Sequence, residues 1–347
     1  MLSDMNRREF LAMGAVIPAG AMTNTYDNVK LGIDLFSLRA QQWTPFEALD
    51  YCAARKVQVV HFSEIRFIGN LEPEHLRKVR AHAAKLGLEL EIGMRSICPT
   101  STMFEKKEGT AEEQLGRMID AANIVGSHIV RAVLGSGEDR TKPGPIEARI
   151  EDTATVLKNV RTKAIDNNIK IAIENHAGDM QARELKMLIE TAGKDFVGVC
   201  LDAGNPLWTI EDPHLTLEVL HPYVLTSHLR DSAVWTVPQG AAVSWVEIGR
   251  GNVDIDGYVK KYIELCPARA LSLESIIFGP RVLPFKDAKF WEGYRKTPAW
   301  EFERFLEIAE RGKPYQEEPW EKGDEPRRER EALDASLGYL KKLLGRA

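Results

Sequence analysis

Four side chains that can hold a metal ion end four successive apolar segments of the sequence. These residues are Glu174, Asp202, His228 and Glu274. If the segment ends converge, three carboxylates and an imidazole would repel one another and lose their hydration at high cost, unless a positive charge lies among them. A divalent cation removes that cost. A mostly oxygen ligand set with one nitrogen favours Mn²⁺, and Mg²⁺, Co²⁺ or Zn²⁺ are alternatives.

The four segments belong to a series of eight apolar runs, each of which predicts a β-strand. The runs span residues 29–39, 57–64, 88–95, 128–135, 169–176, 196–206, 224–231 and 270–275. Most of them are almost continuously hydrophobic rather than strictly alternating. This pattern is typical of parallel strands that are covered on both faces.

Helical patterns separate the predicted strands and occur at residues 45–56, 73–87, 111–126 and 148–168. The alternation of strand and helix predicts a (β/α)8 TIM barrel, in which active sites lie at the C-terminal ends of the strands. A doubly wound open sheet is the alternative. It is disfavoured because the first strand is not followed by a glycine-rich phosphate-binding turn.

The N-terminal segment predicts an export signal. Arg7 and Arg8 precede an apolar run that ends in the small residues Ala19, Gly20 and Ala21. The pattern resembles a twin-arginine signal with a cleavage site, so residues 1–25 predict an exported, periplasmic protein; an ordinary amphipathic helix is the alternative. The run is too short to span a bilayer. Since no other stretch is long enough, we expect no membrane span in the mature form.

The rest of the chain predicts a barrel domain over residues 26–312 and a helical tail over residues 313–347. Leucines at helical spacing in the tail indicate an amphipathic helix, which either covers the barrel or contacts another subunit of a homo-oligomer. The net charge of −5 gives no basic excess of the kind that nucleic-acid binding needs. The four cysteines are widely spaced and lack a CxxC pair, which favours buried thiols over disulfides.

The ordered motifs IAIENH, VCLDAGNP, SHLRD, GRGNVD and LSLES, between residues 171 and 275, resemble the xylose isomerase-like TIM barrel superfamily. Within it, the chain is similar to proteins described as sugar phosphate isomerases or epimerases. The resemblance covers about residues 30 to 280. It implies that Glu174, Asp202, His228 and Glu274 bind one divalent cation. It also implies that Glu174 and Glu274 are the catalytic acid/base pair, transferring protons through an enediolate of a carbohydrate substrate.

Three other activities remain as alternatives. The first is a metal-dependent lyase or hydratase that acts on 3-keto-glycosides or other oxidised sugars, because phosphorylated sugars are scarce outside the cytoplasm. The second is a sugar-binding protein without catalysis, which the intact ligand set disfavours. The third is a nuclease, because HLRD echoes a motif of the abasic-site endonucleases in this superfamily. Those enzymes need further histidines, and this chain has Met94-Arg95 and Asn205 at the relevant places.

Six further residues near the predicted strand ends are candidates for substrate binding: His61, Arg95, His176, Asn205, Trp208 and Arg230. For the arginines the alternative is an ion pair at the barrel rim. For His61 the alternative is a core histidine whose ring nitrogens are hydrogen-bonded within the protein. Asn175 and His176 flank Glu174, where hydrogen bonds that orient a metal ligand are expected. The aromatic residues 290–300 form either a platform for sugar rings or a helix edge packed on the barrel.

Overall fold

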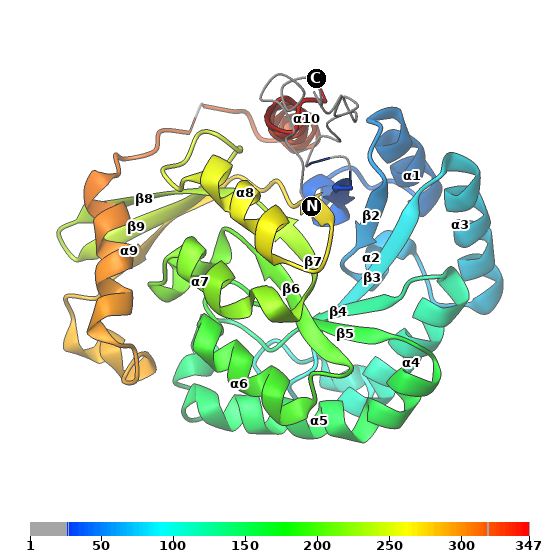
Figure 1. Ribbon diagram of the computed structural model, residues 1–347, viewed down its shortest axis with the longest axis horizontal. Coiled ribbons are helices and arrows are strands. Elements are labelled where there is room, and N and C mark those ends of the chain that lie inside the picture. Colours follow the sequence, from blue (N-terminus) through cyan, green and yellow to red (C-terminus); the bar gives the residue numbers. More distant parts are fainter. Residues whose placement is uncertain (1–25, 27, 318, 347) are drawn as a thin grey trace, which may run out of the picture.

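The eight predicted strands form one closed parallel barrel, so the predicted TIM-barrel fold is confirmed (Figure 1). The computed structural model describes residues 26, 28–317 and 319–346, and the predicted signal segment, residues 1–25, lies outside them. In chain order the barrel strands are β1 (Lys30–Asp34), β2 (Val59–Phe62), β3 (Glu89–Ser96), β4 (Ile129–Val133), β5 (Lys170–Glu174), β6 (Val197–Asp202), β7 (Val224–Leu229) and β10 (Ala270–Leu273). Strand β10 pairs with both β7 and β1, which closes the ring.

A helix follows each barrel strand and lies on the outside of the barrel (Figure 1). These helices are α1 (Pro45–Ala54), α3 (Pro73–Leu86), α4 (Ala111–Val125), α5 (Ile146–Asp166), α6 (Ala182–Ala192), α7 (Pro213–Leu220), α8 (Ile255–Leu265) and α10 (Glu325–Leu343). Thr44 and Glu47 form a reciprocal capping box at the start of α1. Gly87 ends α3 with a φ of 70°, a conformation that glycine adopts without a steric cost.

Helix α10, in the predicted tail, takes the place of the eighth barrel helix between α1 and α8 (Figure 1). Asp334 accepts a hydrogen bond from Arg55, at the end of α1, and Tyr339 donates one to Asp256 of α8. Leu333 and Leu340 are fully buried. The tail therefore covers the barrel, which is one of the two roles expected for it. Helix α10 completes the outer layer between β10 and β1.

A small antiparallel sheet that the sequence did not predict lies beside the C-terminal end of the barrel. Its strands are β8 (Asp231–Val237), β9 (Gly240–Val246) and β11 (Phe278–Leu283), in the order β11-β9-β8. Helix α9 (Ala299–Arg311) packs on β8. The aromatic segment before it packs on itself and on α9: the rings of Phe290 and Tyr294 lie 4.8 Å apart, and the ring of Trp291 lies 4.9 Å from that of Phe302 in α9. The packed helix edge therefore describes this segment better than an open platform.

Two predicted strands end earlier than the sequence indicated, and each is followed by a 3-10 helix. Strand β1 ends at Asp34, whose Oδ1 accepts the N–H of Phe36 and caps the 3-10 helix Leu35–Leu38. Strand β6 ends at Asp202, before the 3-10 helix Asn205–Thr209. Apolar residues continue past the ends of both strands, so hydrophobicity alone could not show where each strand ends. The other short helices of the described residues are α2 (Ile65–Ile68) and the 3-10 helices Lys106–Glu108, Gly137–Arg140, His221–Tyr223 and Ala288–Gly293.

All four cysteines are free and buried, in agreement with the thiol interpretation. Among the helices of the described residues, none combines the length and the apolar character that crossing a bilayer requires.

We expect Leu340→Ala to lower the free energy of unfolding by about 2–5 kcal/mol, because it opens a cavity between α10 and the barrel. The matched control is Lys342→Ala, an exposed position on the same helix, which should change stability by less than about 0.5 kcal/mol. Urea unfolding of the two variants measures the difference. Equal effects would show that α10 is not an integral layer of the barrel.

Candidate metal centre

The four residues that prompted the metal hypothesis converge at the C-terminal end of the barrel. One potential ligand atom from each of Glu174, Asp202, His228 and Glu274 lies within 4.8 Å of all the others. His228 Nδ1 is 3.0 Å from Glu174 Oε2 and 3.2 Å from Glu274 Oε2. The strands β5, β6, β7 and β10 are neighbours in the barrel, so ends that are up to 100 residues apart in the chain meet at one point.

The chemistry of this set fits a divalent cation. Glu174, Asp202 and His228 are fully buried, and Glu274 is 5% exposed. Three of the candidate ligand atoms make no hydrogen bond to the described part of the chain: Asp202 Oδ2, His228 Nδ1 and Glu274 Oε2. Buried polar atoms normally have such a partner, so these three atoms indicate a site for an ion. The hard carboxylate oxygens suit Mn²⁺ or Mg²⁺, and the same set is compatible with Zn²⁺.

Two buried arginines balance part of the negative charge. Arg131 Nε donates to Glu174 Oε2 at 2.6 Å, and Arg230 Nη2 lies 2.6 Å from Asp202 Oδ2 and also pairs with Glu274. Arg230 can reach this position because Gly204 has no side chain; a Cβ there would lie 2.4 Å from Arg230 Cγ. The arginines leave the ligand set anionic, with fewer positive than negative groups.

The pKa values of the set diverge. Burial raises the pKa of Glu174, but Arg131 and His228 outweigh it and hold that pKa well below its usual range. Burial raises the pKa of Asp202 to about 6 despite Arg230. Burial opposes charge on His228, but Cys200, Glu174 and Asp34 raise the pKa of its ring well above its usual value. In the absence of a cation, a proton on His228 therefore stands in the middle of the carboxylates.

A cavity of about 270 Å³ lies above the ligand set and has Glu274 in its wall. Four of the six predicted substrate contacts also line it: Arg95, His176, Asn205 and Arg230. Asn205 Nδ2 donates to Glu174 Oε1 at 3.1 Å, which fixes the carboxylate from the side of the cavity. His176 Nδ1 is bonded to the carbonyl oxygen of Gly135 at 2.7 Å, so its ring orientation is set from the barrel rim.

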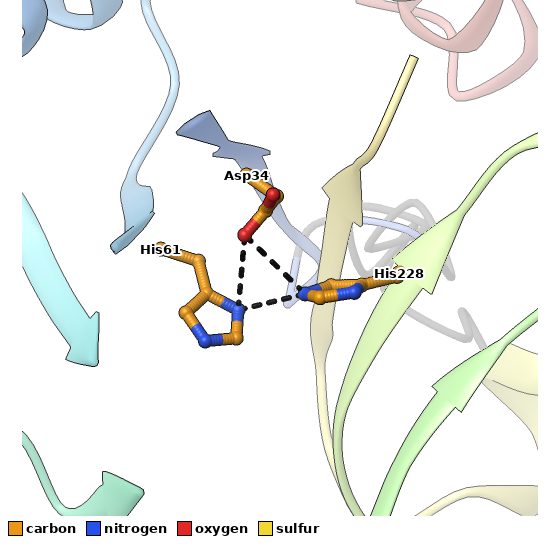
Figure 2. Close-up of side chains that lie close together, drawn as sticks. All are labelled: Asp34, His61 and His228. Carbon is orange, nitrogen blue, oxygen red and sulfur yellow. Dashed lines mark hydrogen bonds and ion pairs between the residues drawn. The ribbon is translucent and has the colours of Figure 1, made fainter. Parts of the chain in front are cut away.

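The other two predicted contacts, His61 and Trp208, do not line this cavity. His61 is fully buried beneath His228, and its Nδ1 is 2.8 Å from His228 Nε2 (Figure 2). Trp208 is buried against Trp245, with ring centroids 4.5 Å apart, and Trp245 is the tryptophan that lines the cavity. The structure therefore places both predicted residues one layer behind the cavity wall.

Two residues of the site escaped the sequence analysis. Asp34 ends β1, and its Oδ2 lies 3.5 Å from His228 Nε2 (Figure 2). The signal that could have found it is its charge, because Asp34 is a carboxylate inside the otherwise mostly apolar run 29–39. Trp245 belongs to the unpredicted strand β9, so no barrel pattern could have found it.

Neighbouring polar residues hold the site in shape. The side chain of Asn175 bonds both the N–H and the carbonyl oxygen of Asp202, at 2.8 and 2.9 Å. Asp231 accepts hydrogen bonds from the N–H groups of Gly249 and Gly251, at 3.0 Å each, and so anchors the GRGNVD segment. Asn175 thus orients a candidate ligand, while Asp231 has a structural role next to Arg230.

Comparison with known proteins agrees with this geometry at the level of fold. Among curated proteins, the 3-oxo-isoapionate decarboxylase of Pectobacterium atrosepticum is 25% identical over 213 residues, which cover 60% of this chain and 69% of that protein. Among solved structures, L-ribulose 3-epimerase matches 91% of this chain and 95% of its own with a TM-score of 0.60 and 16% identity. The IOLI protein with a bound zinc atom matches 80% of this chain and 96% of its own, with a TM-score of 0.54 and 15% identity.

The two solved structures share the fold with this chain at low sequence identity. The family model described as xylose isomerase-like TIM barrel matches residues 47–265, which is more than half of the chain. Together with the closed eight-stranded barrel, this match shows that the chain belongs to the xylose isomerase-like TIM barrel family.

Proposed function

We propose that this protein is a divalent-metal-dependent sugar isomerase or epimerase. The observation that carries the proposal is the buried set of Glu174, Asp202, His228 and Glu274, whose ligand atoms converge next to a cavity that Glu274 lines. When bound, a divalent cation, for which we propose Mn²⁺, supplies Lewis-acid polarisation of a substrate carbonyl. The family and the sugar epimerase neighbour support a carbohydrate substrate.

The two glutamates are suited to move the proton. Glu174 and Glu274 come from non-adjacent strand ends and approach His228 Nδ1 separately, so they flank the place where a substrate would reach the floor of the cavity. Glu174 is held ionised by Arg131 and can therefore accept a proton from a carbon next to the carbonyl. Glu274, in the cavity wall, returns a proton. Return to the opposite face gives epimerisation, and return to the adjacent carbon gives isomerisation.

A lyase that acts on oxidised sugars is the second candidate, and Arg95 favours it. Arg131 and Arg230 are both paired with carboxylates, whereas Arg95 lines the cavity without a hydrogen bond or ion pair to any described residue. A free guanidinium is suited to a substrate carboxylate. Loss of CO₂ from a 3-keto acid leaves its bonding electrons on the carbonyl as an enolate, which then takes up a proton. The curated relative is itself named a decarboxylase.

We expect Glu174→Gln and Glu274→Gln each to slow exchange of the α-proton of a ketose with solvent deuterium by roughly 10²–10⁴-fold, because each removes one proton carrier. The exchange is followed by NMR in deuterium oxide, after incubation with Mn²⁺-loaded protein and removal of the ion. The matched control is Glu64→Gln, which alters a carboxylate in the cavity wall that pairs with Arg66. Full exchange in Glu174→Gln, with its metal content unchanged, would refute the acid/base assignment.

We expect Arg95→Gln to weaken binding of D-gluconate to the Mn²⁺-loaded protein by roughly tenfold and to leave binding of D-sorbitol unchanged. The two probes have the same carbon chain and differ in the carboxylate, so the ratio of their dissociation constants isolates its contribution. Arg66→Gln is the control, because Arg66 is exposed and pairs with Glu64. An unchanged ratio in Arg95→Gln would remove the support for an acidic substrate and leave the isomerase proposal intact.

We expect Mn²⁺ binding at pH 7 to release about one proton, which comes from His228, because a ring nitrogen must lose its proton before it can bind a metal. As the pH falls below about 6, the pKa of Asp202, release should increase and the affinity should fall further, since the cation must then displace a second proton. Calorimetry in buffers of different ionisation enthalpy counts the protons. Binding without proton release at pH 7 would show that His228 is already neutral in the metal-free protein.

A further inference from the structure

A second histidine lies directly beneath the candidate metal ligand His228. His228 Nε2 and His61 Nδ1 are 2.8 Å apart, and the ring centroids are 4.8 Å apart with planes at 51° (Figure 2). Both side chains are fully buried. At this distance the two nitrogens form a hydrogen bond, so one of them carries a proton and the other accepts it.

Metal binding decides which nitrogen donates. His228 would hold a cation among the carboxylates through Nδ1, because this is the nitrogen that faces Glu174 and Glu274. A neutral imidazole then carries its only proton on Nε2. His228 Nε2 must therefore donate, and His61 Nδ1 must accept. In the opposite arrangement the proton of His228 would lie on Nδ1, where it would occupy the position of the ion.

Asp34 is close to both rings but is not placed to accept in place of His61. Its Oδ2 lies 3.5 Å from His228 Nε2 and 3.7 Å from His61 Nδ1, which is beyond normal hydrogen-bond length (Figure 2). Its Oδ1 is held by the hydroxyl group of Ser63 and the N–H of Phe36, at 2.9 and 2.8 Å. The other facing carboxylate, Glu91, is 3.8 Å from His61 Nδ1 and accepts a hydrogen bond from Thr226.

We propose that His61 is a positioning residue for the metal centre: its Nδ1 accepts the Nε2–H of His228 and directs the Nδ1 lone pair of His228 at the cation. A ligating histidine commonly donates its second N–H to a carboxylate, a backbone carbonyl or water. Here a neutral imidazole accepts instead, and it adds no negative charge beside three carboxylate ligands. The remaining proton of His61 then lies on Nε2, which has no hydrogen-bond partner among the described residues.

The inference rests on the metal site of the proposed function, and the test separates the two. His61→Leu removes the acceptor, whereas His61→Asn keeps an oxygen near the position of Nδ1. We expect His61→Leu to weaken Mn²⁺ binding about 10- to 100-fold and His61→Asn to restore most of the affinity. Val60→Ala is the matched control, since Val60 is the preceding residue of β2, fully buried in the hydrophobic core. Calorimetry on the metal-free proteins measures the affinities, and thermal unfolding confirms that each variant is folded.

The tautomer of His61 provides a readout independent of both activity and stability. In the Zn²⁺-loaded wild-type protein, ¹⁵N-histidine NMR should show His61 protonated on Nε2 and His228 protonated on Nε2, with assignments taken from His61→Asn. His61 protonated on Nδ1, or Mn²⁺ affinity in His61→Leu equal to that of Val60→Ala, would overturn the role of His61. A wild-type protein that binds no divalent cation would overturn the metal site itself. The NMR result decides the proposal even where His61→Leu does not fold.

Discussion

The removal of three carboxylates from water at one end of the barrel is the constraint on which the rest of the site depends. Glu174 and Asp202 have no exposed surface, and Glu274 has little. An uncompensated charge in such a place is too costly to keep, so each must be paired, protonated or bound to an ion. Arg131 and Arg230 supply two of the compensating charges, and the point on which the four ligand atoms converge is where a further one belongs.

The register of the barrel explains why these carboxylates meet. Glu174 pairs with Cys200 across β5 and β6, and Asp202 pairs with His228 across β6 and β7. His228 in turn pairs with Ser272, two residues before Glu274. Asp202 and His228 thus lie at the same level, whereas Glu174 and Glu274 are each offset by two residues from the neighbouring ligand, and residues two apart on a strand point to the same face. The tilt of the strands in a closed barrel brings these positions together on its inner face.

The barrel strands and the four candidate ligands could be predicted from the sequence. Parallel strands that are covered on both faces consist of apolar runs, and a polar residue at the end of such a run is easily recognised. Features that depend on a turn inside an apolar run, or on contacts between distant residues, could not be predicted from the local sequence. Asp34 was overlooked because Leu35–Leu38 continues the apolar run into a 3-10 helix. Strand β8 begins two residues after β7 ends, so the two read as one segment. The roles of His61 and α10 depend on contacts with residues 167 and 279 positions away, which no local pattern encodes.

The charge balance of the site bears on its chemistry as well as on its stability. With a divalent cation in place, the three negative ligands would be met by the positive charges of the cation and of Arg131 and Arg230. Transfer of the α-proton from the sugar to Glu174 leaves the net charge of the site unchanged. It moves one negative charge from the carboxylate to the substrate oxygens, toward the fixed positive groups. Charges fixed before the reaction begins stabilise the intermediate more than the bound substrate, which is the condition for catalysis rather than mere binding. Arg230 therefore helps both to make the metal site tolerable in a barrel core and to stabilise the negative charge that the proton transfer places on the substrate, whereas Arg131 keeps Glu174 ionised before the transfer.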